Sequence, residues 1–190
     1  LRTILIVVHD YPPIRSAGTE RVLKFSQYLP EFGYRPVILT TGRYGGLPDD
    51  AARDVHRASD LTQSLFSPLR RRKAAGVAAE DQVRIATVSN ASLPGRLRDA
   101  LMIPDTKIGW RIPAVQLGRR LIAERRPDLI LSSSPPETAH LIAGDLARAT
   151  RVPWVADLRD GWLFEPPVPQ LRSGRLRRAL EGRMERGMAA

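Results

Sequence analysis

The sequence predicts an α/β domain in which helices flank a parallel sheet, and three observations support this prediction. Short apolar runs alternate with stretches that carry apolar residues at helical spacing. The first run, residues 3–8, is unbroken and rich in β-branched residues, which is typical of a strand buried on both faces. A helix and a second strand follow it within about forty residues, and such a unit favours a right-handed crossover and parallel pairing.

The first unit continues from the turn at Pro12 and Pro13 into a helix that is expected to begin near residues 16–19. Gly33 is a natural end for this helix, because glycine accepts the left-handed conformation common after a helix. The second strand is predicted at residues 36–41. The expected apolar stripe of the helix consists of Val22, Phe25, Leu29 and Phe32.

The next forty residues carry weaker signals. Residues 42–48 are rich in glycine, and residues 61–69 show no clean period, so this part is interpreted as a long irregular excursion. A third strand is predicted at residues 83–88. A short helix is expected within residues 92–102, after Pro94 and Gly95.

Regular patterns return at Trp110. The sequence predicts a helix over residues 110–126, a strand at 128–131, a helix at 136–150 and a strand at 154–156. A proline-rich break at residues 165–169 precedes a basic helix at 174–190. That last helix carries apolar residues at every fourth position, and we expect this stripe to be buried as ordinary core: Leu176, Leu180, Met184 and Met188.

The composition excludes several kinds of protein. The chain has 190 residues, which fits one ordinary domain. It has no cysteine, which excludes disulfide scaffolds, thiol nucleophiles and cysteine zinc sites. His9, His56 and His140 show no metal-binding spacing, so no metal site is predicted.

The longest apolar run, residues 4–8, is far shorter than a membrane span or a signal core, and a cytoplasmic location is expected. Because the sequence begins with Leu1, we expect a trimmed start.

The net charge is strongly positive, at +10 from 30 basic and 20 acidic residues. This balance favours an anionic partner, which is a nucleic acid, a phospholipid or a phosphorylated substrate. A general arginine bias would produce the same count. Residues 70–73 form the densest basic cluster, and its two interpretations are contact with an anionic membrane and a solvated loop.

Polar residues follow several of the predicted strands. Ligands of open parallel sheets bind outside the carboxyl ends of the strands, so these residues predict a site on one rim. Loops after strands are polar in any case, and each group alone has that simpler interpretation. The groups are His9, Asp10 and Tyr11; Thr40, Thr41 and Gly42; Ser132, Ser133 and Ser134; and Asp157, Arg159 and Asp160.

Two segments are weighed individually, one at the start of the first helix and one on the rim. Gly18, after Ser16, lets backbone N–H groups at the start of a helix approach a phosphate, although Ser16 is equally explained as a helix cap. Asp157 and Asp160 flank Arg159 directly after a buried strand, where the alternative is a structural ion pair. His140 is interpreted as structural.

At these residues the chain resembles the start of a family 4 glycosyltransferase. The resemblance rests on residues 9–13, Gly18, residues 21–25, 104–110, 132–136 and 157–160, in the expected order. It implies the GT-B architecture of two Rossmann-like domains, of which this chain is the N-terminal, acceptor-side half. Residues 1–164 would form that Rossmann-like domain. Residues 165–190 would form a linker and helix leading to a C-terminal domain that holds most of the nucleotide-sugar site, so the fragment alone would be inactive.

The resemblance also implies roles for individual residues. Gly18, with Ser16, would face the donor phosphate, and Asp157, Arg159 and Asp160 would position the acceptor. Arg159 stands where many members have a histidine, which puts a histidine-assisted step in doubt. The cleft would be lined by substrate-binding residues: His9, Asp10, Asp105 and Ser134.

The implied reaction is a retaining, hexosyl-type transfer from a nucleotide sugar. The leaving phosphate would help to deprotonate the acceptor, and no metal or other cofactor would be needed. The implied acceptor is a sugar or a lipid-linked or cell-envelope glycan. Work at the inner face of a membrane would follow from a lipid-linked acceptor.

Two alternatives stay open at this point. One is a nucleotide-binding domain of another class, but dinucleotide binding needs a tighter glycine fingerprint and an acidic residue where Thr40 and Thr41 end the second strand. The other is a basic nucleic-acid-binding module, which predicts exposed aromatic residues on a basic face. Aromatic residues make up only 6% of the chain, so nucleic acid is not the expected partner.

Overall fold

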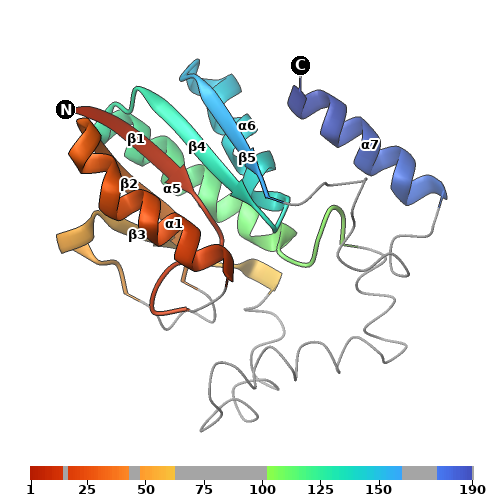
Figure 1. Cartoon of the computed structure of the whole chain (residues 1–190). Helices are drawn as coiled ribbons and strands as arrows, with labels where there is room; N and C mark the ends of the chain where they lie inside the picture. The colour runs from red at the N-terminus through yellow and green to blue at the C-terminus, as the bar shows by residue number, and fades with distance from the viewer. Residues whose placement is uncertain (15–16, 43–47, 63–101, 160–174, 190) are drawn as a thin grey trace, which may run out of the picture.

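The computed structural model describes residues 1–14, 17–42, 48–62, 102–159 and 175–189 (Figure 1). Five strands pair in the order β3-β2-β1-β4-β5, and all neighbouring strands run parallel. The predicted α/β class with a Rossmann-like parallel sheet is therefore confirmed. The strands are β1 (Arg2–Val7), β2 (Tyr34–Thr41), β3 (Val55–Ala58), β4 (Leu129–Ser134) and β5 (Trp154–Leu158).

Helices cover both faces of this sheet. α1 (Ala17–Tyr28) lies on one face, and α5 (Arg111–Arg125) and α6 (Thr138–Thr150) lie on the other (Figure 1). α7 (Arg175–Ala189) contacts α6. Three short 3-10 helices complete the described part of the chain: η1 (Leu29–Phe32), η2 (Ala51–Arg53) and η3 (Ile108–Trp110).

The alternation of side chains along β1 builds a core on each face. Leu5 and Val7 pack with residues of α5 and α6, whereas Ile4 and Ile6 pack on the opposite face with Val22 of α1. All five side chains are buried. Burying each such side chain contributes about 1.5–3 kcal/mol, so the central strand anchors both layers. This explains why the unbroken apolar run was a reliable strand signal.

The strands differ from the predictions at three places. β3 lies within the segment that the sequence indicates as irregular. It was not predicted because its four residues, VHRA, include only two buried side chains and show no apolar run. β4 continues through the three serines that were expected to follow it. β5 continues to Leu158, so Asp157 belongs to the strand rather than to the loop after it.

The end of α1 corrects its predicted stripe. Val22 is buried, but Phe32 is 74% exposed. The α-helix gives way at Leu29 to a 3-10 helix that contains Pro30, and the tighter winding moves Phe32 off the inward face. Gly33 ends the helix as predicted, at φ 81°, a conformation that other residues rarely adopt.

The predicted apolar stripe of α7 is buried only in part where it is described, with Met184 and Met188 half-buried. Leu180 is 40% exposed, whereas Glu181 is fully buried. The Arg177 Nε donates to Glu181 Oε1 at 2.9 Å, and Arg177 Nη2 donates to the carbonyls of Met102 and Pro104. The pair of Arg177 and Glu181 at i,i+4 spacing lies within α7, and the same arginine connects α7 to the chain before α5. A pattern of apolar residues cannot indicate such polar contacts.

Several predictions lie outside the described residues. They are the strand at 83–88, the helix within 92–102 apart from Met102, the basic cluster at 70–73 and the break at 165–169.

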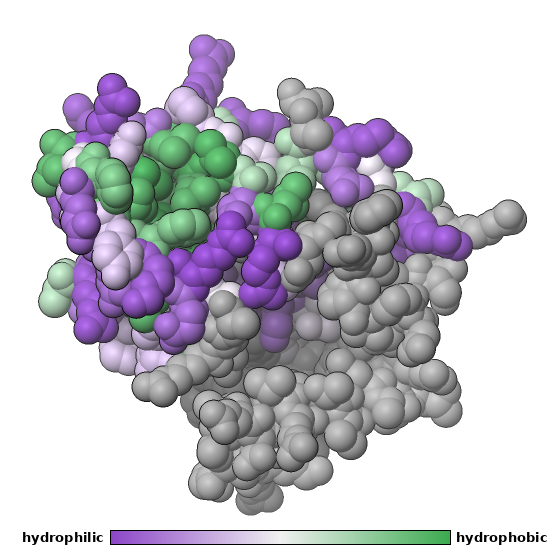
Figure 2. Space-filling model, in the orientation of Figure 1, coloured by the Kyte–Doolittle hydropathy of each residue, from purple (hydrophilic) through white to green (hydrophobic). Residues whose placement is uncertain are grey.

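Within the described part, the α1 side of the sheet shows a hydrophobic area bordered by hydrophilic side chains (Figure 2). Val155 is in register with Leu131 of that side's core and is 48% exposed.

Candidate functional site

The candidate site lies where the order of the strands reverses. The chain builds β1, β2 and β3 outward in one direction and then crosses to place β4 and β5 on the other side of β1. The carboxyl ends of β1 and β4 are therefore neighbours, although the loops that follow them lead away from each other. Ligands of open α/β sheets bind at this kind of switch point.

A small hollow of about 30 Å³ marks the switch point. Loop residues after β1, the first turn of α1 and the end of β4 line it together. Its lining is Val8, His9, Asp10, Gly18, Val22, Ser133, Ser134 and Pro135. The hollow has room for little more than one water molecule, so these residues form one wall of a site rather than a complete pocket.

His9 is held rigidly on this wall. Its side chain is 2% exposed and lies edge-on to Trp110 of η3, with 5.4 Å between ring centroids. Its Nδ1 donates to Asp10 Oδ1 at 2.9 Å, and its carbonyl accepts from Thr40 Oγ1 and from the Thr41 N–H. Because the ring is packed, His9 orients the Asp10 carboxylate, whose side chain keeps 28% of its surface exposed.

Asp157 lies beside the hollow and is held from two directions. Its Oδ1 accepts from Arg21 Nη2 of α1 at 2.5 Å, and its Oδ2 accepts from Ser133 Oγ of β4 at 2.8 Å. Ser133 and Asp157 are register partners in the parallel β4–β5 pair, which brings their side chains to the same face. Since Ser133 also lines the hollow, one hydrogen bond connects Asp157 to the switch point.

A buried network lies under this edge of the site. Ser132 Oγ accepts from Trp154 Nε1 at 2.8 Å and hydrogen-bonds with His140 Nδ1 at 2.7 Å. Burial lowers the pKa of His140 to about 4, and the nearby Asp157 charge only partly opposes this effect. His140 is therefore neutral at neutral pH and joins α6, β4 and β5, which agrees with its interpretation as a structural residue.

Asp105 lies at the start of α6 rather than in the hollow. Its Oδ2 accepts from the Thr138 N–H at 2.8 Å, and its Oδ1 accepts from the Lys107 N–H at 2.7 Å. The Thr138 hydroxyl also hydrogen-bonds to this carboxylate. These contacts give Asp105 a capping role, because the first N–H groups of a helix have no partner within the helix.

A comparison with protein-family models decides the family. The model described as a glycosyl transferase 4-like domain matches residues 16–190, which is most of the chain. The chain belongs to this family. No curated protein sequence matches it.

The glycosyl transferase 4-like domain brings together only part of the predicted site. His9, Asp10, Gly18 and Ser134 line one hollow, and Asp157 adjoins it. Arg159 follows β5 and is exposed, whereas Ser16 and Asp160 lie outside the described residues. The described residues include no group of three or more histidine, aspartate or glutamate side chains that could hold a metal ion.

Two residues that contact the predicted site in this glycosyl transferase 4-like domain, Ser133 and Arg21, had no individual role assigned from the sequence. Ser133 was noted only as one of three serines, and the alternation of burial along β4 separates it from its buried neighbours Ser132 and Ser134. Arg21 lies one helical turn after Gly18, so it projects from the same end of α1. That spacing was available in the sequence as a signal for Arg21.

Proposed function

We propose that this domain takes part in transferring a sugar, with retention of configuration, from a nucleotide-sugar donor to an acceptor hydroxyl. The observation that carries the proposal is the hollow at the switch point. There Gly18 in the first turn of α1 faces Asp10, Ser133 and Ser134. Backbone donors and carboxylates meet at the edge of the sheet where nucleotide ligands of this fold class bind.

The start of α1 suits the donor phosphate. The first turn of a helix presents N–H groups without helical partners, and the helix dipole favours an anion there by about 0.3–1 kcal/mol. Gly18 has no side chain to keep a phosphate oxygen away from these groups. Ser16 precedes this turn in sequence and is assigned to the same subsite. The Asp10 carboxylate repels phosphate, so we assign the sugar hydroxyls to Asp10, with His9 behind it as the residue that orients it.

Asp157 is assigned to the acceptor, together with Arg159 and Asp160. A carboxylate that already accepts from Arg21 and Ser133 is fixed in orientation and retains lone pairs for a donating hydroxyl. In the proposed reaction the acceptor oxygen bonds to the anomeric carbon while the bond from that carbon to the diphosphate breaks. The hydroxyl proton passes to the leaving phosphate. Asp157 positions the acceptor and is not required as a strong base.

The proposal includes the division of the chain and its surroundings. Residues 1–164 are assigned to the Rossmann-like domain, and 165–190 to a linker and helix that lead to a C-terminal domain. The acceptor would be a sugar or a lipid-linked glycan, and the basic residues 70–73 would meet the inner, anionic face of a membrane. Among the described helices, none has the length and hydropathy of a membrane span.

The end of β2 argues against a dinucleotide site. Thr40 and Thr41 lie where that site needs an acidic residue for the ribose, and both are fully buried. The Thr40 hydroxyl donates to the His9 carbonyl at 2.9 Å. The threonines support the β1 loop instead of facing a ligand.

The test is a screen of sugar nucleotides with the protein that includes the downstream domain. We expect donor hydrolysis or transfer with at least one sugar nucleotide. We also expect Asp157→Ala to lower turnover by roughly 100-fold without unfolding, because misplacing a reactant has effects of that size. Asp160→Ala is the companion variant. If no sugar nucleotide binds or reacts, and random DNA binds with a steep salt dependence, the transferase proposal is wrong and nucleic-acid binding replaces it.

A further inference from the structure

The loop that follows β1 carries Asp10 and is anchored to the sheet through its backbone carbonyls. The His9 carbonyl accepts from the Thr40 hydroxyl at 2.9 Å and from the Thr41 N–H at 3.2 Å. Both threonines end β2 and are buried. These bonds fix the loop on the N-terminal side of Asp10, and the part that continues to Pro12 needs contacts of its own.

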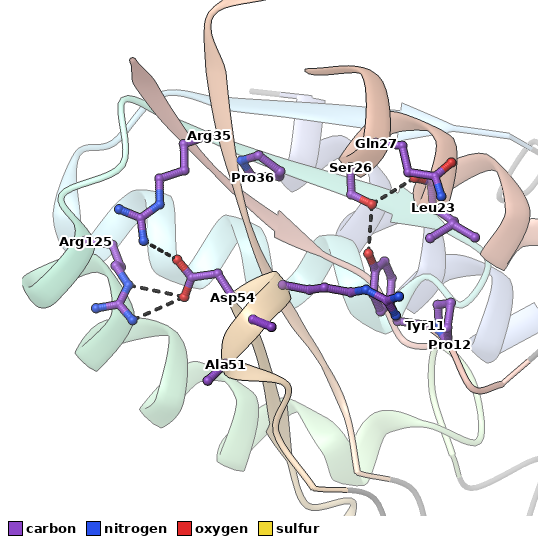
Figure 3. Close-up of a pocket in the computed structure, with 12 residues that line it drawn as sticks. Tyr11, Pro12, Leu23, Ser26, Gln27, Arg35, Pro36, Ala51, Asp54 and Arg125 are labelled. Carbon is purple, nitrogen blue, oxygen red and sulfur yellow. Dashed lines mark hydrogen bonds and ion pairs between the residues drawn. The ribbon is translucent and has the colours of Figure 1, made fainter. Parts of the chain in front are cut away.

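The far part of the loop borders a cavity. Tyr11 and Pro12 line this cavity, whose volume is about 510 Å³ (Figure 3). The Tyr11 hydroxyl hydrogen-bonds to Ser26 Oγ of α1 at 2.7 Å, and Figure 3 shows Pro12 next to Tyr11 at the same end of the cavity. A residue that borders a cavity has fewer atoms to pack against. The position of Pro12 therefore depends more strongly on its backbone hydrogen bond.

Arg57 of β3 supplies that hydrogen bond. Its Nη2 donates to the Pro12 carbonyl at 2.5 Å, and its Nη1 makes a longer contact of 3.4 Å with the Thr41 carbonyl. Its Nε donates to the Pro48 carbonyl at 2.8 Å. One guanidinium therefore joins the loop after β1 to the end of β2 and to the segment before β3. The planar fork of an arginine presents these donors in a fixed geometry that a lysine does not have.

Arg57 is itself held firmly. Its backbone N–H donates to Asp49 Oδ1 at 2.7 Å, and it is the register partner of Thr40 in the β2–β3 pair. Burial lowers the pKa of the Arg57 guanidinium, and the charges of Asp49 and Asp50 oppose this effect. An arginine nevertheless stays charged at neutral pH. Its hydrogen bonds to the carbonyls are therefore charge-assisted, and such bonds are roughly twice as strong as neutral ones.

We propose that Arg57 is a positioning residue for the donor sugar, because it holds the loop after β1 so that the Asp10 carboxylate faces the hollow. This inference rests on the proposed function, in which Asp10 binds the sugar hydroxyls. Asp10 lies between two anchors, the His9 carbonyl held by β2 and the Pro12 carbonyl held by Arg57. The carboxylate is therefore preorganised before the donor binds. Arg57 is not among the described residues that line the hollow, so it acts through the loop.

The test compares Arg57→Lys with the wild-type protein, both with the downstream domain and with the sugar nucleotide that the screen identifies. We expect kcat/KM for this donor to fall about tenfold, because misplacing a group by about 1 Å costs up to roughly 100-fold. KM for the acceptor should not change, since β3 and the β5 strand of Asp157 are opposite edges of the described sheet. Arg57→Met, which keeps only the apolar stem, should lose at least as much. Because lysine keeps the charge, full activity of Arg57→Lys would overturn the proposal.

Asp10→Ala tests whether Arg57 acts through Asp10. This variant alone should lower kcat/KM for the donor at least as much as Arg57→Lys does. Once the carboxylate is absent there is no group left to position, so adding Arg57→Lys should change kcat/KM by less than about twofold. Effects that multiply in the double variant would mean that Arg57 acts elsewhere, and they would overturn the proposal.

Amide hydrogen exchange reports on the loop without any substrate. The N–H groups of Thr41 and Ile14 donate to carbonyls of this loop, and in Arg57→Lys they should exchange roughly tenfold faster. The Ile130 N–H of β4, which donates to the Pro153 carbonyl, should keep its rate. Unchanged exchange at the loop would show that Arg57 does not hold it. Faster exchange at all three groups would show general destabilisation, and either result would overturn the proposal.

The matched control is Arg35→Lys, near the amino end of β2. Arg35 donates to Asp54 at 2.6 Å, as Figure 3 shows, so this change also removes an arginine fork and keeps the charge. We expect it to leave kcat/KM for the donor unchanged, and an equal loss in both variants would overturn the proposal. If the wild-type protein reacts with no sugar nucleotide, the proposed function fails together with this role. An active wild-type protein with an equally active Arg57→Lys variant refutes the role of Arg57 alone.

Discussion

Asp157 and Asp54 are two carboxylates that bind arginines, and they lie at opposite ends of the sheet. Asp157 is at the carboxyl end of β5, and Asp54 precedes β3 at its amino end. Asp54 accepts four hydrogen bonds from Arg35, Arg125 and His56. Asp157 accepts two, one from Arg21 and one from Ser133.

The difference between them matches an anchoring role for Asp54 and the proposed ligand contact for Asp157. A carboxylate has about four acceptor positions, so Asp54 has none left for a substrate while Asp157 keeps some. Burial opposes ionisation of Asp54, but hydrogen bonds from His56, Arg125 and Arg35 outweigh it and lower its pKa. Position in the sheet and accepting capacity therefore both support the proposal that Asp157 contacts a ligand, whereas Asp54 anchors the fold.

The largest expected effect is that acid pH destabilises the region under Asp157 at a higher pH than the region around Asp54. His140, in the network under Asp157, has a pKa lowered by burial to about 4, against 6.5 in the unfolded chain. Between these values the unfolded chain binds a proton that the folded chain does not. The free energy of unfolding should therefore be fully maintained above pH 6.5 and fall by about 3 kcal/mol as the pH drops to 4. Asp54 has a lowered pKa, so its contribution is lost only below its ordinary value of 3.8.

Urea denaturation between pH 7.5 and 4 measures this effect, and His140→Asn is the matched control. The variant should start less stable, because a buried hydrogen bond to Ser132 is altered, but its stability should vary less with pH. An equal slope in both proteins would mean that His140 does not titrate as its burial indicates. The histidine network would then not distinguish the two regions.

Removing the charge of Asp54 should produce the next largest effect. Asp54→Asn keeps a residue that tolerates the left-handed backbone at φ 51°, so the change isolates the charge. We expect a loss of about 2 kcal/mol in the free energy of unfolding, measured in urea, since charged hydrogen bonds are lost but Arg35 is half exposed. Asp157→Asn should cost less than about 1 kcal/mol, because its pair with Arg21 is partly solvated. A larger stability loss at Asp157 than at Asp54 would reverse the comparison.

The fold was predictable where a local pattern or a single special residue specifies an element. The β-branched run of β1 and the glycine after η1 predicted the first unit of the sheet. β3 was missed because VHRA pairs with β2 through its backbone and has no apolar run. The burial of Glu181 was missed because it depends on Arg177 and on carbonyls about seventy-five residues earlier in the chain, a distance that local pattern cannot express.

The site was predictable to the level of the rim. The rule that ligands bind at the carboxyl ends of strands gathered His9, Asp10 and Ser134, and these residues line one hollow with Gly18, which was singled out at the start of a helix. The contacts of Asp157 were not predictable, because Ser133 reaches it only through the β4–β5 register and Arg21 only through the placement of α1 on the sheet. The spacing of Arg21 from Gly18 indicates only which end of α1 it occupies. Asp105 resembles a cleft residue in sequence, whereas in the structure its carboxylate caps α6.

The smallest expected effect tests how Asp157 is held. Arg21→Gln removes an ion pair whose arginine is 42% exposed, and Ser133→Ala removes the second hydrogen bond. Each change alone should lower turnover of the protein with its downstream domain by roughly fivefold, because the remaining contact still orients the carboxylate. Arg119→Gln, on the exposed surface of α5, is the charge control.

The double variant decides between two accounts of these contacts. If Arg21 and Ser133 act together on Asp157, removing both should lower turnover by more than the product of the single effects, since the carboxylate then has no described partner. If their effects simply multiply, each residue acts independently, for example by contacting substrate itself. Asp157 would then owe its orientation to β5 alone, and the contrast with the fully bonded Asp54 would rest on position in the sheet and not on hydrogen bonding.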